Sequence, residues 1–261
     1  MSECRDRRHQ MTAMVTLARH RNSLLRVSAF MTTLTRFLKR PASVLVAGAL
    51  CIPFATTHAQ SPAEASYARV AQAWKGTRTL EANFEQKITN PIVGRSVSSS
   101  GVFQQERPGK LAITFTQPAG DRIVGDGKSL WVYLPSSTPG QVLKLPASAD
   151  GAIVADMLGQ LLDTPTRAFA ISGGEAATIE GRSTRRVQLL PRTAGSVPFQ
   201  KAVLWLDDKE PRPVRVQVVD GQGVDRTITL TTWRPDATLP ANTFTFQVPK
   251  GVKVSTKLPG S

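Results

Sequence analysis

The clearest structural signal in the sequence is Leu80-Glu81-Ala82-Asn83-Phe84-Glu85-Gln86-Lys87-Ile88. Apolar and polar side chains alternate through most of this stretch, which is typical of a strand in a sheet with one apolar face. Turn signals such as Pro108-Gly109 and Gly125-Asp126-Gly127 separate further runs with the same period. The other alternating runs are 111–116, 214–218, 227–231 and 244–248. Many short strands in series predict a mainly β protein built as an antiparallel sandwich or barrel.

A first helix is predicted ahead of these strands. Apolar residues recur at three- and four-residue steps through Pro62–Lys75. Ser61 is a suitable N-cap and Pro62 suits the first turn, while Gly76 is a suitable end.

A second helix is predicted in mid-chain, over Asp150–Asp163, with Asp150 as a plausible cap. Apolar pairs recur there every four residues, at Ile153/Val154, Met157/Leu158 and Leu161/Leu162. They form a wide apolar stripe. Such a stripe can be ordinary core or the wall of a cavity, and periodicity does not separate the two.

A secretory signal precedes the β-rich part. A basic patch at 36–40 leads into an apolar run at 44–55, and the segment ends at Thr57-His58-Ala59. These three features are typical of a signal peptide. The run is shorter than the about 20 apolar residues that cross a bilayer, although an uncut membrane anchor is an alternative. We expect cleavage near Ala59.

The domain organisation follows from this signal. Residues 1–59 are expected to be an upstream extension plus the signal peptide, and Met31 is a better start than Met1. Residues 60–261 are expected to form a single domain, because no linker or composition break divides them.

Residues 60–261 contain neither cysteine nor histidine, since both cysteines and all three histidines precede Gln60. This excludes a disulfide, a Cys/His zinc site and a nucleophile–histidine triad in that part. We therefore expect no metal, no cofactor and no enzymatic activity.

The net charge of residues 60–261 is smaller than that of the whole chain. Nine of 33 basic and two of 19 acidic residues precede Gln60, which leaves 24 basic and 17 acidic residues and a net charge of +7. Such a moderately basic surface is compatible with an acidic partner, with anionic lipid head groups or equally with an ordinary solvated face, and it is below the charge typical of a nucleic-acid-binding protein.

Four motifs in order resemble those of the LolA family of outer-membrane lipoprotein carriers. Leu80–Lys87 is similar to the opening strand of the family, and Gly101–Leu111 to its Gly…Arg-Pro segment. Asp126–Tyr133 resembles the pattern Asp-Gly-Lys-x-Leu-Trp-x-Tyr, and Phe244–Val252 the closing Phe-x-Phe-x-Pro-x-Gly-Val. The resemblance extends over about residues 60–254.

The resemblance implies an unclosed antiparallel β-barrel, a half-barrel sheet, covered by a lid of short helices that enclose a hydrophobic cavity. It implies a periplasmic chaperone of a Gram-negative bacterium, a monomer that carries acylated lipoproteins from the inner to the outer membrane. The implied partners are an inner-membrane lipoprotein-releasing ABC transporter and an outer-membrane lipoprotein receptor. In the family an arginine of the Arg-Pro segment holds the lid closed through hydrogen bonds to the lid backbone, a role that falls on Arg107.

A carrier of acyl chains needs an apolar, adaptable lining, because each exposed CH₂ group costs about 0.8 kcal/mol in water. From the strands we expect the lining to comprise Phe84, Leu111, Ile113, Phe115, Trp131, Tyr133, Leu204, Val216, Ile228 and Leu230. From the lid we expect Met157, Leu158, Leu161 and Leu162. Both faces of the strand over 130–134 are apolar, and we place its aromatic pair, Trp131 and Tyr133, inward.

Other functions remain as alternatives. A lipid-transfer or lipoprotein-sensing paralogue of the same fold would share every feature above. An enzyme would have to use carboxylates, and no pair can be placed at the about 5–5.5 Å of a retaining glycosidase. A polyanion-binding protein would interleave aromatic and basic residues, yet only Lys128 lies close in sequence to Trp131 and Tyr133.

Overall fold

The structure is a computed structural model that describes residues 60–147 and 156–256. The expected signal peptide at 1–59 lies outside the described residues. The strands are β1 (Thr79–Asn90), β2 (Arg95–Glu106), β3 (Lys110–Gln117), β4 (Arg122–Asp126), β5 (Ser129–Tyr133), β6 (Gln141–Pro146), β7 (Phe169–Ile179), β8 (Arg182–Pro191), β9 (Lys201–Asp207), β10 (Pro213–Val219), β11 (Asp225–Leu230), β12 (Arg234–Pro235) and β13 (Lys253–Ser255).

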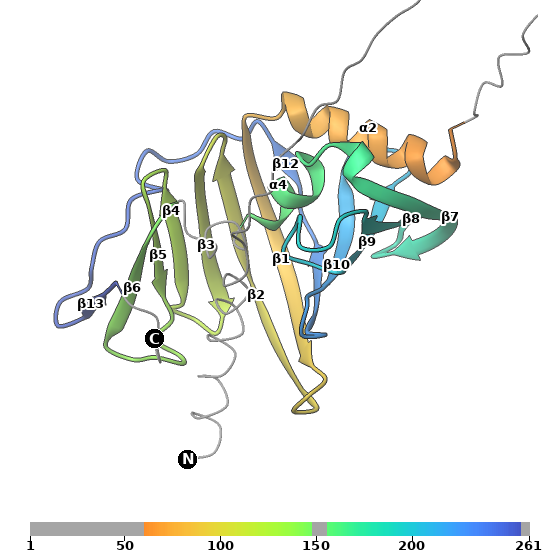
Figure 1. The fold of residues 1–261 in the computed structure, drawn as a ribbon. Coiled ribbons are helices and arrows are strands. Elements are labelled where there is room, and N and C mark those ends of the chain that lie inside the picture. Colours follow the sequence, from red (N-terminus) through yellow and green to blue (C-terminus); the bar gives the residue numbers. More distant parts are fainter. Residues whose placement is uncertain (1–59, 148–155, 257–261) are drawn as a thin grey trace, which may run out of the picture. The chain divides into compact units, whose positions relative to one another are not determined.

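All of these strands belong to one sheet, in the order β13-β6-β5-β4-β3-β2-β1-β11-β10-β9-β8-β7, with β12 added beside β1 (Figure 1). Every pairing is antiparallel except that of β13 with β6. Within the described residues the two end strands, β13 and β7, do not pair with each other. The predicted fold class, a mainly β protein with an unclosed antiparallel sheet, is confirmed.

The register of the sheet separates two faces. Phe84 on β1 lies opposite Gly101 on β2 and Leu230 on β11, and Gly101 lies opposite Phe115 on β3. Directly opposed residues share a face. We call the face that carries Phe84, Phe115 and Leu230 the lid face, because the helices lie on it, and the opposite one the outer face (Figure 1).

The first helix, α2 (Pro62–Gly76), forms as predicted. Ser61 caps it reciprocally with Glu64: Glu64 N donates to Ser61 Oγ at 3.2 Å, and Ser61 N donates to the Glu64 carboxylate at 2.9 Å. Its buried stripe is formed by Ala63, Tyr67, Val70, Ala71 and Trp74, and contacts strands β7, β8 and β9.

The mid-chain helix, α4 (Met157–Leu162), is shorter than predicted within the described residues. Its N-cap is Asp156, whose Oδ1 accepts a hydrogen bond from Gly159 N at 3.0 Å. The predicted cap Asp150 and the apolar pair Ile153/Val154 lie outside the described residues. Between α4 and β7, a 3₁₀ turn, η2, spans Thr166–Ala168.

The predicted strand at 244–248 is wrong, because Phe244 ends a turn and residues 245–248 pair with no other strand among the described residues. Its residues alternate nevertheless: Phe244 is buried, and Phe246 stacks on Trp131 of the outer face with ring centroids 5.4 Å apart. Figure 1 shows this C-terminal segment running from β12 to the far edge of the sheet, where β13 pairs with β6. Alternation therefore reflected packing on a surface and not backbone pairing.

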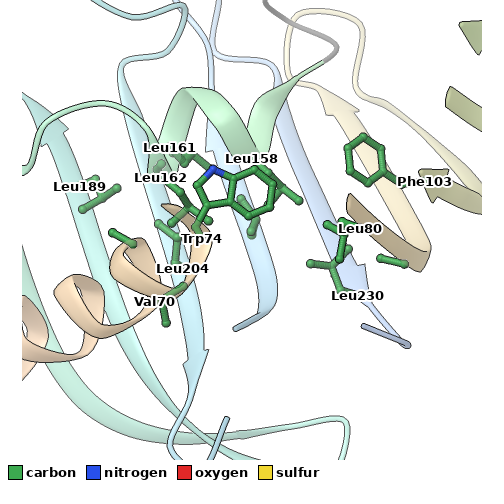
Figure 2. Packing of buried hydrophobic residues seen from close by; sticks show 14 of the residues in the cluster. Val70, Trp74, Leu80, Phe103, Leu158, Leu161, Leu162, Leu189, Leu204 and Leu230 are labelled. Carbon is green, nitrogen blue, oxygen red and sulfur yellow. The ribbon is translucent and has the colours of Figure 1, made fainter. Parts of the chain in front are cut away.

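The core joins the two helices to the lid face. Figure 2 shows Trp74 of α2 packed beside Leu158, Leu161 and Leu162 of α4, with Leu204 of β9 nearby. Tyr67 OH donates a hydrogen bond to Leu161 O at 2.5 Å. Burial, with a smaller contribution from the charge of Asp163, raises the pKa of Tyr67 to about 12, so this hydroxyl remains a donor at neutral pH.

Asp156 also ties α4 to the sheet. Its carboxylate accepts a hydrogen bond from the side chain of Gln105 on β2 in addition to the bond from Gly159 N. Burial nevertheless raises the pKa of Asp156, because it outweighs these two hydrogen bonds. The ionised form of Asp156 is therefore destabilised in the folded protein.

Asp156→Asn should retain an oxygen that caps Gly159 but remove the charge. A raised pKa in the folded state means that Asp156 contributes stability below its ordinary pKa, and that this contribution is lost as pH rises through the raised value. The melting temperature of the variant relative to the unsubstituted protein should therefore increase between about pH 4 and pH 7. A gain of about 1 kcal/mol corresponds to about 2–4 °C in a domain of this size. A difference that is flat or decreases with pH in thermal unfolding would contradict this account of Asp156.

Candidate functional site

The lid face carries a cavity of about 400 Å³. It lies on strands β1, β2, β3, β4, β10 and β11 and reaches α4. Most of its wall is apolar, and its lining includes eight of the residues expected from the sequence: Phe84, Ile113, Phe115, Val216, Ile228, Leu230, Met157 and Leu158. Alternation within each strand brings the six strand residues to one face, and the pairing of neighbouring strands brings them together.

Four further expected residues are on the correct side of the sheet or in the lid but do not line the cavity. Leu111 and Leu204 point to the lid face and are buried in the core. Leu161 and Leu162 are fully buried where α4 meets α2. These four leucines hold the lid and the sheet together.

The expected inward orientation of Trp131 and Tyr133 is wrong. Leu130 lies opposite Gly125, and Val132 opposite Ile123, whose partner across β3 is the cavity residue Ile113. This register places Leu130, Val132 and Leu134 on the lid face and the aromatic pair on the outer face.

Both aromatic rings pack against the C-terminal segment instead. The centroid of the Phe246 ring lies 5.4 Å from that of Trp131 and 6.0 Å from that of Tyr133. Asp126 fixes the Trp131 ring, because its Oδ2 accepts a hydrogen bond from Trp131 Nε1 at 3.1 Å. Lys144 Nζ lies 4.6 Å from the ring centroid on the same face. The Asp-Gly-Lys-x-Leu-Trp-x-Tyr motif therefore anchors a segment of the chain on the outer face.

Several cavity residues were missed by the sequence analysis. Apolar ones are Ile88, Phe103, Ile123, Leu134, Phe199 and Val218, and polar ones include Gln86, Asn90, Ser99 and Arg226. Continued alternation along β1 could have identified Gln86, Ile88 and Asn90. Phe199 lies in a segment before β9 with no periodic pattern, so nothing in the sequence marked it.

Arg107 connects the two helices. Its Nη1 donates to the carbonyl oxygen of Trp74 and, at 3.4 Å, to that of Thr77, both at the end of α2. Its Nη2 donates to Asp163 Oδ1 at 2.5 Å, and Asp163 is the C-cap of α4. The guanidinium also lies 4.7 Å from the centroid of the Trp74 ring.

These acceptors differ in part from the expectation for Arg107. The backbone carbonyls belong to α2, and α4 contributes a carboxylate instead of its backbone. The side chains of Arg107 and Asp163 are 22% and 41% exposed. Water competes with such an ion pair, so the connection is of modest strength.

Residues 60–147 and 156–256 contain no group of three or more His, Cys, Asp or Glu side chains that could hold a metal ion. The same residues contain no helix long and apolar enough to span a membrane.

Comparison with known proteins agrees with the resemblance of the motifs. Residues 75–247 match the family model described as outer membrane lipoprotein carrier protein LolA. An outer-membrane lipoprotein carrier protein of Chromobacterium violaceum is 30% identical over 74% of this chain and 89% of its own length. One of Bordetella bronchiseptica is 30% identical over 80% of this chain and 95% of its own length. A solved LolA superfamily protein from Nitrosomonas europaea is 14% identical, covers 70% of this chain and 97% of its own, and has a TM-score of 0.36. The chain belongs to the LolA family of outer membrane lipoprotein carrier proteins.

Proposed function

We propose that this chain is a periplasmic chaperone that binds the acyl chains of lipoproteins released from the inner membrane and carries them to the outer membrane. The observation that carries the proposal is the apolar cavity between the lid face and α4. About ten CH₂ groups of an acyl chain cost about 8 kcal/mol when exposed to water. A carrier that crosses an aqueous compartment must offset this cost with an apolar wall, and Phe84, Phe115 and Ile228 supply one.

The finer parts of this function follow from the family. The donor would be an inner-membrane lipoprotein-releasing ABC transporter, and the acceptor an outer-membrane lipoprotein receptor. The chain would act in the periplasm of a Gram-negative bacterium as a monomer, without catalysing a reaction. Residues 60–261 would be the mature, single-domain carrier after cleavage near Ala59. The alternative is a lipid-transfer or lipoprotein-sensing paralogue with the same cavity.

Arg107 bonds to the end of α2 and to Asp163 of α4, and we call this connection the latch. A latch suits a carrier because cargo must also be released. Arg107 holds α2 and α4 together when the cavity is closed, so its bonds favour the closed, empty form. A cargo that requires α4 to move must break those bonds on entry. The latch therefore opposes retention of cargo, and a ligand shifts such an equilibrium only by its preference for one form.

Residues 60–261, purified from the periplasm of a host that makes lipoproteins, should carry acylated protein detectable by mass spectrometry. Phe115→Asp or Leu158→Asp should remove that cargo, because each places a charge in the apolar wall. The matched control is Val248→Asp, since Val248 is 40% exposed and lies away from the cavity wall. Free phospholipid as the only bound species would favour a lipid-transfer paralogue. A preparation of folded protein with nothing bound would contradict the proposal.

Arg107→Leu should fold but retain cargo. A hydrogen bond to a charged group contributes about 1.5–3 kcal/mol, and solvent exposure of this pair places its value toward the lower limit. We therefore expect hand-off of bound lipoprotein to an acceptor membrane to slow about tenfold, as measured by the rate of cargo transfer. Arg234→Leu is the control, because Arg234 forms a comparable pair with Glu81 at 2.9 Å on the outer face. Hand-off at the rate of the unsubstituted protein would refute the latch.

A further inference from the structure

The cavity has a polar end that the carrier function does not explain. Along β1 the inward residues run from Phe84 through Gln86 and Ile88 to Asn90 as the strand approaches its hairpin with β2. On the neighbouring strand β11 the same direction leads from Leu230 through Ile228 to Arg226, which lies opposite Ile88. Toward the hairpins the cavity wall therefore becomes mixed, because polar side chains and one cation lie among apolar ones.

Arg226 is the cation of this polar end. It lies between Ile88 on β1 and Val218 on β10, and all three residues line the cavity. The adjoining turn, which joins β10 to β11, contributes Asp220 and Val224 to the same wall. A Cβ on Gly223 in this turn would lie 3.4 Å from Pro91 Cγ, so the turn packs beside the β1–β2 hairpin.

Within the described residues, no hydrogen bond or ion pair of the Arg226 side chain is found. Three other arginines of the sheet are paired: Arg215 with Glu180, Arg182 with Asp207, and Arg234 with Glu81. The charge of Asp220 acts on Arg226, but the hydrogen bonds that Asp220 accepts come from its own turn. Its Oδ1 accepts hydrogen bonds from Gln222 N at 2.8 Å and Val224 N at 3.0 Å.

The Arg226 side chain is half-buried and has no hydrogen-bond or ion-pair partner among the described residues. Burial lowers the pKa of Arg226, yet a guanidinium remains protonated in proteins, so the charge persists in the wall. A desolvated charge is costly unless it is paired and hydrogen-bonded. Its five N–H groups form a planar fork that matches the oxygens of a carboxylate or a phosphate. A neutral carbonyl would accept a hydrogen bond but leave the charge unbalanced.

We propose that this end of the cavity binds the acidic head group of a lipid, a phosphate or a carboxylate, with Arg226 as its counter-ion. The acyl tail extends from Arg226 along Ile228 and Phe84 toward Met157 and Leu158 of the lid. This inference rests on the proposed function, because it assumes that the apolar part of the cavity accepts an acyl chain. It adds that the chain selects lipids by the charge of the head group.

The test compares a fluorescent polyene fatty acid with its methyl ester, which has the same tail but no charge. Titration of residues 60–261 with each probe at about pH 7.5 should give at least about tenfold tighter binding of the acid, as expected for a charge-assisted bond. Arg226→Met should reduce the affinity for the acid to that for the ester and leave the affinity for the ester unchanged. Arg215→Met is the matched control, because Arg215 lies on the adjacent strand and bonds to Thr229 and Glu180 instead.

The outcomes separate the two proposals. Equal binding of acid and ester by the unsubstituted protein, or a preference for the acid that survives Arg226→Met, would overturn the role of Arg226 while leaving the carrier function intact. Failure of both probes to bind would instead contradict the carrier function itself. Displacement of the bound ester by palmitate or by lysophosphatidylglycerol distinguishes a carboxylate from a phosphate as the preferred head group, and either supports the proposal.

Discussion

The structure depends on one constraint: a long sheet with an apolar face that is not closed into a barrel. Within the described residues β13 and β7 stay apart, so the sheet cannot bury that face against itself. Apolar area must be covered by another element or remain available to a ligand. Helix α2 covers strands β7 to β9. Over β1, β2, β3, β4, β10 and β11, the six-residue helix α4 covers only part of the face, and the cavity occupies the rest.

The small helix α4 is consequently held by individual bonds as much as by packing. Tyr67 binds its backbone at Leu161, Asp156 caps its first turn, and Arg107 binds Asp163 at its end. The Tyr67 bond is buried and the Asp156 bond is partly buried, whereas the side chains of the Arg107 pair are more exposed and the pair is correspondingly weak. A closure assembled from a few bonds of this kind can open at a cost of a few kcal/mol, which is the range in which a ligand can shift an equilibrium.

Much of this arrangement could be predicted from the sequence, where pattern and environment agree. The alternation through Leu80–Ile88 identified β1 and its inward face correctly, because one face of that strand is apolar and the other charged. The strand over 129–133 has two apolar faces, so its orientation depended on pairing with β4, which periodicity does not contain. The alternation at 244–248 came from packing of Phe244 and Phe246 on the outer face, and the backbone there forms no ladder.

The polar residues of the site were the least predictable. Arg226 appears in the sequence as a charged residue beside a turn, where a solvent-exposed position is the ordinary expectation. Only its register with Ile88 and Val218 shows that it faces the cavity. The acceptors of Arg107 were equally hidden, since Trp74 and Asp163 are distant from it in sequence and meet only when α2 and α4 pack together.

The central claim is that cargo occupies the lid face and not the outer face. Photo-crosslinking in the periplasm tests it directly, with benzoylphenylalanine replacing Phe115 or Ile228 on the lid face, or Tyr133 on the outer face. The account predicts crosslinks to the acylated part of a lipoprotein from the first two positions and none from Tyr133. Crosslinks to acyl chains from Tyr133, with none from Phe115 or Ile228, would contradict it.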